Sequence, residues 1–127
     1  MKLRIKGNSL RLRVAPSEMA RLLDIGRIEE TIHFGPEEEA KLTYALEHRP
    51  QSAAMTVRYQ SREVTVVVRT QDAHRWAAEE ELIGLYGEFG IGDHRLDLAV
   101  EKDFACLDSE EPENKDTYPN PKQGAAC

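Results

Sequence analysis

The residues best suited to chemistry lie near the C-terminus, where both cysteines of the chain stand among carboxylates. Zinc accepts thiolate and carboxylate ligands, so one hypothesis is a zinc-like divalent metal site built from Asp103, Cys106, Asp108 and Cys127. The spacing is unlike that of common zinc sites, because no CxxC or HxxxH pair occurs and the two cysteines are far apart in the sequence. The structural alternative is that Cys106 ends a strand half-buried and Cys127 belongs to a weakly ordered tail. No other cofactor is expected.

Residue types that often catalyse reactions are present, but without a catalytic pattern. The sequence neighbours of Cys106 are mostly acidic and disfavour the thiolate that a nucleophile requires. Four histidines share no motif, and no carboxylate pair stands out for acid–base catalysis. We therefore favour a non-enzymatic binding or interaction module with an unknown protein or small molecule as its partner.

Positive charge is concentrated at the start of the chain. Residues 1–27 carry seven basic and two acidic side chains, although the whole chain has a formal charge of −6. A basic segment on an acidic protein can form a local anion-binding surface. The alternative is that Arg4, Lys6, Arg11 and Arg13 are only the solvated side of a strand pair.

A repeated apolar pattern predicts the elements that position these side chains. Shifting residues 3–49 by 54 positions places them without a gap on residues 57–103. Few aligned pairs are identical, but apolar positions coincide along the whole segment, with Ile28 falling on Leu82 and Ile32 on Tyr86. This pattern indicates an internal duplication with repeats at about 3–49 and 57–103.

Each repeat is typical of a hairpin, a helix and a second hairpin. In the first repeat, period-2 alternation predicts strands within 3–14 and at about 27–34 and 41–47, with a helix from Pro16 to Gly26. In the second, it predicts strands at 55–59, 63–69, 82–88 and 95–101, with a helix that has Thr70 as its N-cap. We predict one mostly β (α+β) domain over residues 1–103, a pseudo-twofold barrel of about eight strands with two short helices. Barrel closure would remove the exposed strand edges.

Residues 104–127 differ in composition from the rest of the chain. They carry five acidic and two basic side chains and three of the six prolines, which predicts an acidic, irregular tail of weak order. The exception is Tyr118-Pro119-Asn120-Pro121, where two prolines favour an extended backbone. We expect the tyrosine ring to anchor this segment on the barrel surface.

The opening of the chain has a motif of its own. Gly7-Asn8-Ser9-Leu10, followed by Arg13-Val14, Pro16 and Glu18, resembles the start of the AbrB/MazE swapped-hairpin proteins. The resemblance covers about residues 2–32 and departs from the pattern at Ala15, an extra residue before the proline.

The AbrB/MazE resemblance implies a barrel built from two interleaved units and a nucleic-acid-binding face. The residues that match the DNA-facing strands are Lys6, Arg11 and Arg13. The second repeat has Gln60, Thr65 and Val67 at those positions, so a symmetrical basic face for two half-sites is missing. Nucleic-acid binding through the basic first hairpin is therefore the second alternative to the binding module, after a metal- or thiol-based site in the C-terminal tail.

Over its full length the chain resembles a family of small bacterial proteins of uncharacterised function. The residues that carry this resemblance are the opening MKLRIKGNSLRLR, the segment 100–108 and the segment 118–121. No apolar run approaches the roughly 18 residues of a membrane span, and the first residues lack a secretory pattern. We expect a bacterial cytoplasmic protein without a membrane partner.

Overall fold

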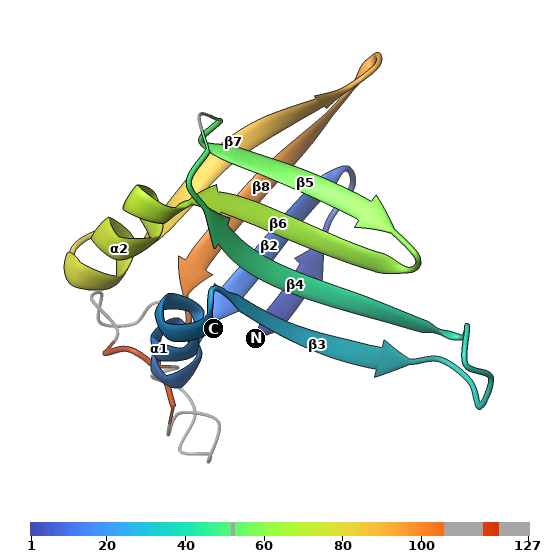
Figure 1. Cartoon of the computed structure of the whole chain (residues 1–127), viewed down its shortest axis with the longest axis horizontal. Helices are drawn as coiled ribbons and strands as arrows, with labels where there is room; N and C mark the ends of the chain where they lie inside the picture. Colours follow the sequence, from blue (N-terminus) through green and yellow to red (C-terminus); the bar gives the residue numbers. More distant parts are fainter. Residues whose placement is uncertain (52, 106–115, 120–127) are drawn as a thin grey trace.

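Alternating apolar and charged residues form strands throughout the part of the chain that the computed structural model describes, residues 1–51, 53–105 and 116–119. The first half comprises β1 (Lys2–Ile5), β2 (Ser9–Val14), α1 (Pro16–Ile25), β3 (Arg27–His33) and β4 (Lys41–Arg49). The second half comprises β5 (Met55–Gln60), β6 (Glu63–Arg69), α2 (Thr70–Ala78), β7 (Gly84–Ile91) and β8 (His94–Lys102) (Figure 1). The prediction of a mostly β domain with eight strands and two short helices is confirmed for these residues.

The strands form two four-stranded sheets, and each sheet takes one hairpin from each half of the chain. Sheet A has the order β1-β2-β8-β7, and sheet B has the order β3-β4-β6-β5. Within each sheet the two hairpins join through a parallel pair, β2 with β8 and β4 with β6. The halves of the chain are therefore interleaved.

The predicted closed barrel is wrong. Among the described residues no strand of sheet A pairs with a strand of sheet B, so β1, β7, β3 and β5 are edges. The edges β5 and β7 meet where the buried side chain of Met55 lies close to Gly87, and no backbone ladder joins them in the described ranges. Away from the helices the hairpins diverge, with β7–β8 and β3–β4 pointing in different directions (Figure 1).

The core lies between the inner faces of the two sheets and is covered at one end by the helices. Trp76 of α2 is fully buried, and its Nε1 donates a hydrogen bond to the carbonyl oxygen of Ile83 at 3.3 Å. The other members of the core cluster come from both sheets and both helices: Leu12, Val14, Met19, Leu22, Ile28, Leu46, Met55, Val66, Val68, Ala73, Leu98 and Val100. The members from β2, β6 and β8 stand two residues apart, as the alternation predicts: Leu12 and Val14, Val66 and Val68, and Leu98 and Val100.

The register of the strands repeats with the same 54-residue offset over most of the chain. In the first hairpin Lys2 lies opposite Arg13, and in the equivalent hairpin Thr56 lies opposite Val67. The parallel pairs also match, since Ser9 faces Asp97 on sheet A and Thr43 faces Glu63 on sheet B. The strand β7 breaks this rule by three residues.

The shift of β7 arises at the end of the preceding helix. After α1, Gly26 has φ of 86° and turns the chain directly into β3, as predicted for a left-handed glycine cap. After α2, Glu79 has φ of −92° and the chain needs residues 79–83 before β7 begins at Gly84. The predicted strand at 82–88 is therefore displaced, and Thr70 is the first helical residue rather than the N-cap.

A short segment after the last strand returns to the domain at Tyr118. The backbone of Tyr118 exchanges hydrogen bonds with Asp103 and Ala105 at 2.8 and 2.7 Å, and its ring lies 6.1 Å from that of Phe104. The predicted anchoring by the tyrosine ring is confirmed, but the ring meets Phe104 and Lys102 at the end of β8 and not the surface of a barrel. Asn120 and Pro121 lie outside the described residues.

Candidate functional site

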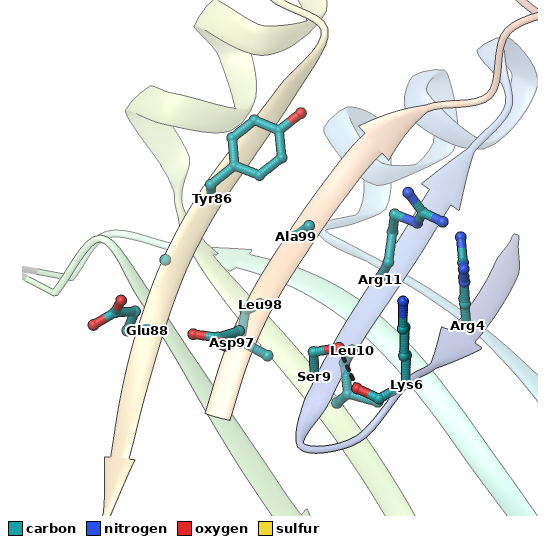
Figure 2. A pocket seen from close by; sticks show the side chains of 11 residues that line it. Arg4, Lys6, Ser9, Leu10, Arg11, Tyr86, Glu88, Asp97, Leu98 and Ala99 are labelled. Carbon is teal, nitrogen blue, oxygen red and sulfur yellow. Dashed lines mark hydrogen bonds between the residues drawn. The ribbon is translucent and has the colours of Figure 1, made fainter. Parts of the chain in front are cut away.

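The outer face of sheet A, which points away from sheet B, carries a groove of about 630 Å³. All four strands of the sheet contribute to its lining (Figure 2). The lining residues are Arg4, Lys6, Ser9, Leu10, Arg11, Tyr86, Gly87, Glu88, Asp97, Leu98 and Ala99. A volume of several hundred Å³ is typical of a small-molecule site.

One row of directly opposed residues crosses the middle of the groove. Arg4 faces Arg11, Arg11 faces Ala99, and Ala99 faces Tyr86 on the successive strands β1, β2, β8 and β7. Figure 2 shows Arg4, Lys6 and Arg11 pointing the same way on one side and Tyr86 on the other. Ala99 lies between Arg11 and Tyr86, and its small methyl side chain leaves space at the centre of the groove.

The cations of the groove are only partly neutralised. Nη1 of Arg11 lies 3.6 Å from Oε1 of Glu101, and Nε of Arg13, just outside the groove, lies 3.8 Å from the same oxygen. The side chains of Arg4 and Lys6 have no hydrogen bond or ion pair with any described residue. The basic side of the groove therefore has charge available for a ligand.

Tyr86 is held in place on the opposite side. Its hydroxyl donates a hydrogen bond to Oε2 of Glu101 at 2.8 Å. Burial of the phenol, and then the bond to the Glu101 carboxylate, raises the pKa of Tyr86 to about 12. The residue is 57% exposed, and its ring presents a fixed aromatic surface to the groove.

The end of the groove near the β7–β8 turn is acidic. Glu88 and Asp97 lie directly opposite each other on β7 and β8. Both are close to Arg95, at 3.7 and 3.4 Å, and both remain more than half exposed. The groove thus has a basic side, an aromatic side and an acidic end.

On the outer face of sheet B the charged side chains pair with one another. Arg27 donates to Glu47 at 3.0 Å, to Glu63 at 2.6 Å and to Thr65 at 3.3 Å. Burial alone would raise the pKa of Glu47, but hydrogen bonds from Arg27 and Arg49 lower it below its usual range. Glu47 is only 7% exposed, so these charges are satisfied within the protein and little of them faces a ligand.

The structure brings the three predicted nucleic-acid residues together on one face. Lys6 and Arg11 line the groove, and Arg13 lies beside it, opposite Lys2 and next to Glu101. Sequence reasoning missed the other half of the site, above all Tyr86. The ungapped repeat placed this tyrosine among the apolar core positions, whereas the three-residue shift of β7 puts it on the outer face.

The predicted metal ligands are described only in part. Asp103 is buried and its carboxylate lies 3.0 Å from Nζ of Lys2. Cys106, Asp108 and Cys127 lie outside the described residues, so this metal site stays a prediction. Within residues 1–51, 53–105 and 116–119, no group of three or more His, Cys, Asp or Glu side chains is arranged to hold a metal ion.

The fold and the groove define a mostly β protein of two open sheets with a charged and aromatic surface site. None of the helices in the described ranges is long and apolar enough to cross a membrane. The chain belongs to the family described as "Family of unknown function (DUF7009)", whose model matches residues 1–122. This confirms the predicted membership of an uncharacterised family. No curated protein and no solved structure matches the chain.

Proposed function

We propose that this protein is a non-enzymatic binding module whose ligand site is the groove on the outer face of sheet A. The ligand is anionic and is held by Arg4, Lys6 and Arg11. The observation that carries the proposal is the difference between the two outer faces: charges on sheet B are paired internally, whereas Arg4 and Lys6 have no partner among the described residues. Unpaired, clustered cations attract anions more strongly than paired ones.

A comparison of two arginines makes this difference specific. Arg4 lies opposite Arg11 on sheet A, and Arg58, 54 residues later, lies opposite Thr65 on sheet B. Nη2 of Arg58 is 3.5 Å from Oε1 of the buried Glu47. The same position thus holds a neutralised cation on one sheet and an unneutralised one on the other, which gives a matched pair for experiments.

The proposal includes an internal duplication as the origin of the fold. Its support is that two ββαββ halves follow one another and that their hairpins pair with a common 54-residue offset, β7 excepted. Once two copies are fused, their outer faces can diverge. One face then serves ligand binding, and the other contributes ion pairs to stability.

Nucleic-acid binding is a second candidate. It is favoured by the position of Lys6, Arg11 and Arg13 on a single face, together with the local AbrB/MazE resemblance of the sequence. Against it, the acidic residues Glu88, Asp97 and Glu101 share that face. A nucleic acid would have to follow the β1–β2 hairpin and avoid the β7–β8 side. Its affinity would then fall steeply with salt concentration, because phosphate contacts release counterions.

Binding assays with three anionic probes test the leading proposal. The probes are inorganic phosphate, a glutamate-rich peptide and a short single-stranded oligonucleotide. We expect saturable binding of at least one probe that is weakened by Arg4→Ala with Lys6→Ala and unchanged by Arg58→Ala. An equal loss of affinity in the double variant and in Arg58→Ala, or no saturable binding of any probe, would contradict the proposal. Turnover of a substrate that depends on Tyr86 or Glu101 would show an enzyme instead.

A further inference from the structure

The arrangement of charge in the groove restricts the kind of anion that fits. Arg4, Lys6 and Arg11 occupy one side, whereas Glu88 and Asp97 occupy the far end of the opposite side. These two carboxylates share one cation, Arg95, so a net negative charge remains at this end and repels a second negative group of a ligand. The ligand therefore carries its negative charge at one end only.

The centre of the groove suits a flat, uncharged body. Ala99 provides a small floor between Arg11 and Tyr86, and the row of these residues contains no carboxylate. The Tyr86 ring is fixed through its bond to Glu101, so it forms a pre-arranged surface for stacking. Aromatic rings stack on such surfaces with a gain of roughly 1–3 kcal/mol per base in nucleic-acid complexes.

The size of the groove points to a small molecule. Three strand spacings separate β1 from β7, which corresponds to roughly 14 Å between their backbones. The volume of about 630 Å³ is within the range of small-ligand pockets. A long polymer would extend beyond the row that offers both cations and an aromatic ring.

The inference drawn from these features rests on the proposed function and makes it more specific. We propose that the groove binds an aromatic phosphomonoester, meaning a phosphomonoester that carries an aromatic ring, such as a nucleoside monophosphate. Arg4, Lys6 and Arg11 hold the phosphate, since guanidinium groups match its geometry with two parallel hydrogen bonds. The ring of the ligand lies over Ala99 and against Tyr86.

Isothermal titration calorimetry of the full chain with AMP, inorganic phosphate and adenosine tests this inference. AMP is expected to bind at least tenfold more tightly than either fragment. Arg4→Ala removes a charged hydrogen bond and is expected to weaken AMP binding roughly tenfold or more. Tyr86→Ala removes the stacking surface and is expected to weaken it at least about fivefold, whereas Tyr86→Phe keeps the ring and most of the affinity.

Two control variants separate these effects from general ones. Arg58→Ala changes the equivalent arginine of sheet B, and Tyr59→Ala removes an aromatic ring that is 67% exposed outside the groove. Both are expected to leave AMP affinity unchanged. Because Arg4 and Tyr86 are also exposed, circular dichroism of their variants should show the fold of the unmodified chain.

The outcomes distinguish the inference from the broader proposal. Equal affinity for AMP and inorganic phosphate, both sensitive to Arg4→Ala, would overturn the aromatic phosphomonoester and leave the anion-binding groove in place. Binding of the glutamate-rich peptide alone would also overturn the aromatic phosphomonoester and leave the anion-binding groove in place. So would an oligonucleotide that binds far more tightly than AMP and requires Lys2 and Arg13. Failure of every anionic probe to bind would overturn both.

Discussion

The hydroxyl of Tyr86 donates a hydrogen bond to Glu101 at 2.8 Å, and this carboxylate lies 3.6 Å from the guanidinium group of Arg11. One acidic side chain on β8 thus connects the aromatic side of the groove on β7 with its basic side on β2. Ala99, between the two sides, leaves the space that a ligand would occupy. The groove is therefore pre-arranged by contacts within sheet A.

The first prediction concerns the titration of Tyr86. Its pKa of about 12, raised from the ordinary 10.0 by burial and then by the bond to Glu101, means that the folded state holds the phenol proton more tightly than the unfolded chain. The resulting contribution to stability is complete below about pH 10 and is lost as the pH rises to about 12. The unmodified chain and Tyr86→Phe can both be titrated by ultraviolet absorbance. The difference between the two curves should give the pKa of Tyr86. In Glu101→Gln the pKa of Tyr86 should fall, and an unchanged titration would contradict the assigned bond.

The second prediction concerns a glycine that lies beside this bond. A Cβ atom on Gly84 would lie 2.7 Å from the carbonyl oxygen of Val100 and 2.8 Å from the hydroxyl of Tyr86. Gly84→Ala should therefore destabilise the fold by about 2 kcal/mol, the usual cost of overpacking. Gly90→Ala on the same strand is the control, since its Cβ would meet nothing within 4 Å, and we expect a change below about 0.5 kcal/mol. Urea denaturation of both variants measures the difference, and equal stability would argue against the close approach at Gly84.

The third prediction separates the roles of the two outer faces. Arg27→Ala removes one of the two arginines that donate hydrogen bonds to the buried carboxylate of Glu47 and should lower the free energy of unfolding by about 2–3 kcal/mol. Arg4→Ala removes an exposed side chain without an ion pair to the described residues, so its effect should stay within about 0.5 kcal/mol. Denaturant titrations at neutral pH provide the comparison. A large loss of stability in Arg4→Ala would mean that this arginine has a structural role. Weaker ligand binding by this variant would then not show that Arg4 contacts the ligand.

The fourth prediction is the pH dependence of the sheet B network. The folded-state pKa of Glu47 lies below the ordinary value of 4.5, because hydrogen bonds from Arg27 and Arg49 outweigh the effect of burial. Its contribution to stability is therefore fully present above about pH 4.5 and is lost as the pH falls through the lower folded value. Glu47→Gln should be less stable than the unmodified chain at pH 7 and approach it in acid. Parallel stability curves from pH 7 to pH 2 would contradict this.

Much of the fold follows from local patterns in the sequence. Alternation located seven of the eight strands closely, and Gly26 correctly ended the first helix. The same patterns cannot show whether two curved sheets close into a barrel, because closure depends on how edge strands meet. Here Met55 packs against Gly87 and takes the place of a backbone ladder between β5 and β7.

The basic side of the groove could be predicted from the sequence, but its aromatic side could not. The basic residues Lys6 and Arg11 stand in a clear alternating strand, so their shared face could be predicted. Tyr86 could not, because an ungapped repeat ignores the five-residue connection that follows a helix capped by Glu79 instead of glycine. A search for a missing helix-ending glycine in the second repeat would have indicated the shift.

We propose above that the outer face of sheet A, and not that of sheet B, binds anions. The most direct test is a titration of isotope-labelled protein with inorganic phosphate at constant ionic strength, followed by two-dimensional nuclear magnetic resonance of backbone and arginine side-chain signals. We expect saturable shifts at Arg4, Lys6 and Arg11 and none at Arg27 and Arg58. In Arg4→Ala with Lys6→Ala, the remaining shift at Arg11 should be lost. Shifts of equal size on both faces, or shifts that persist in the double variant, would contradict the proposal.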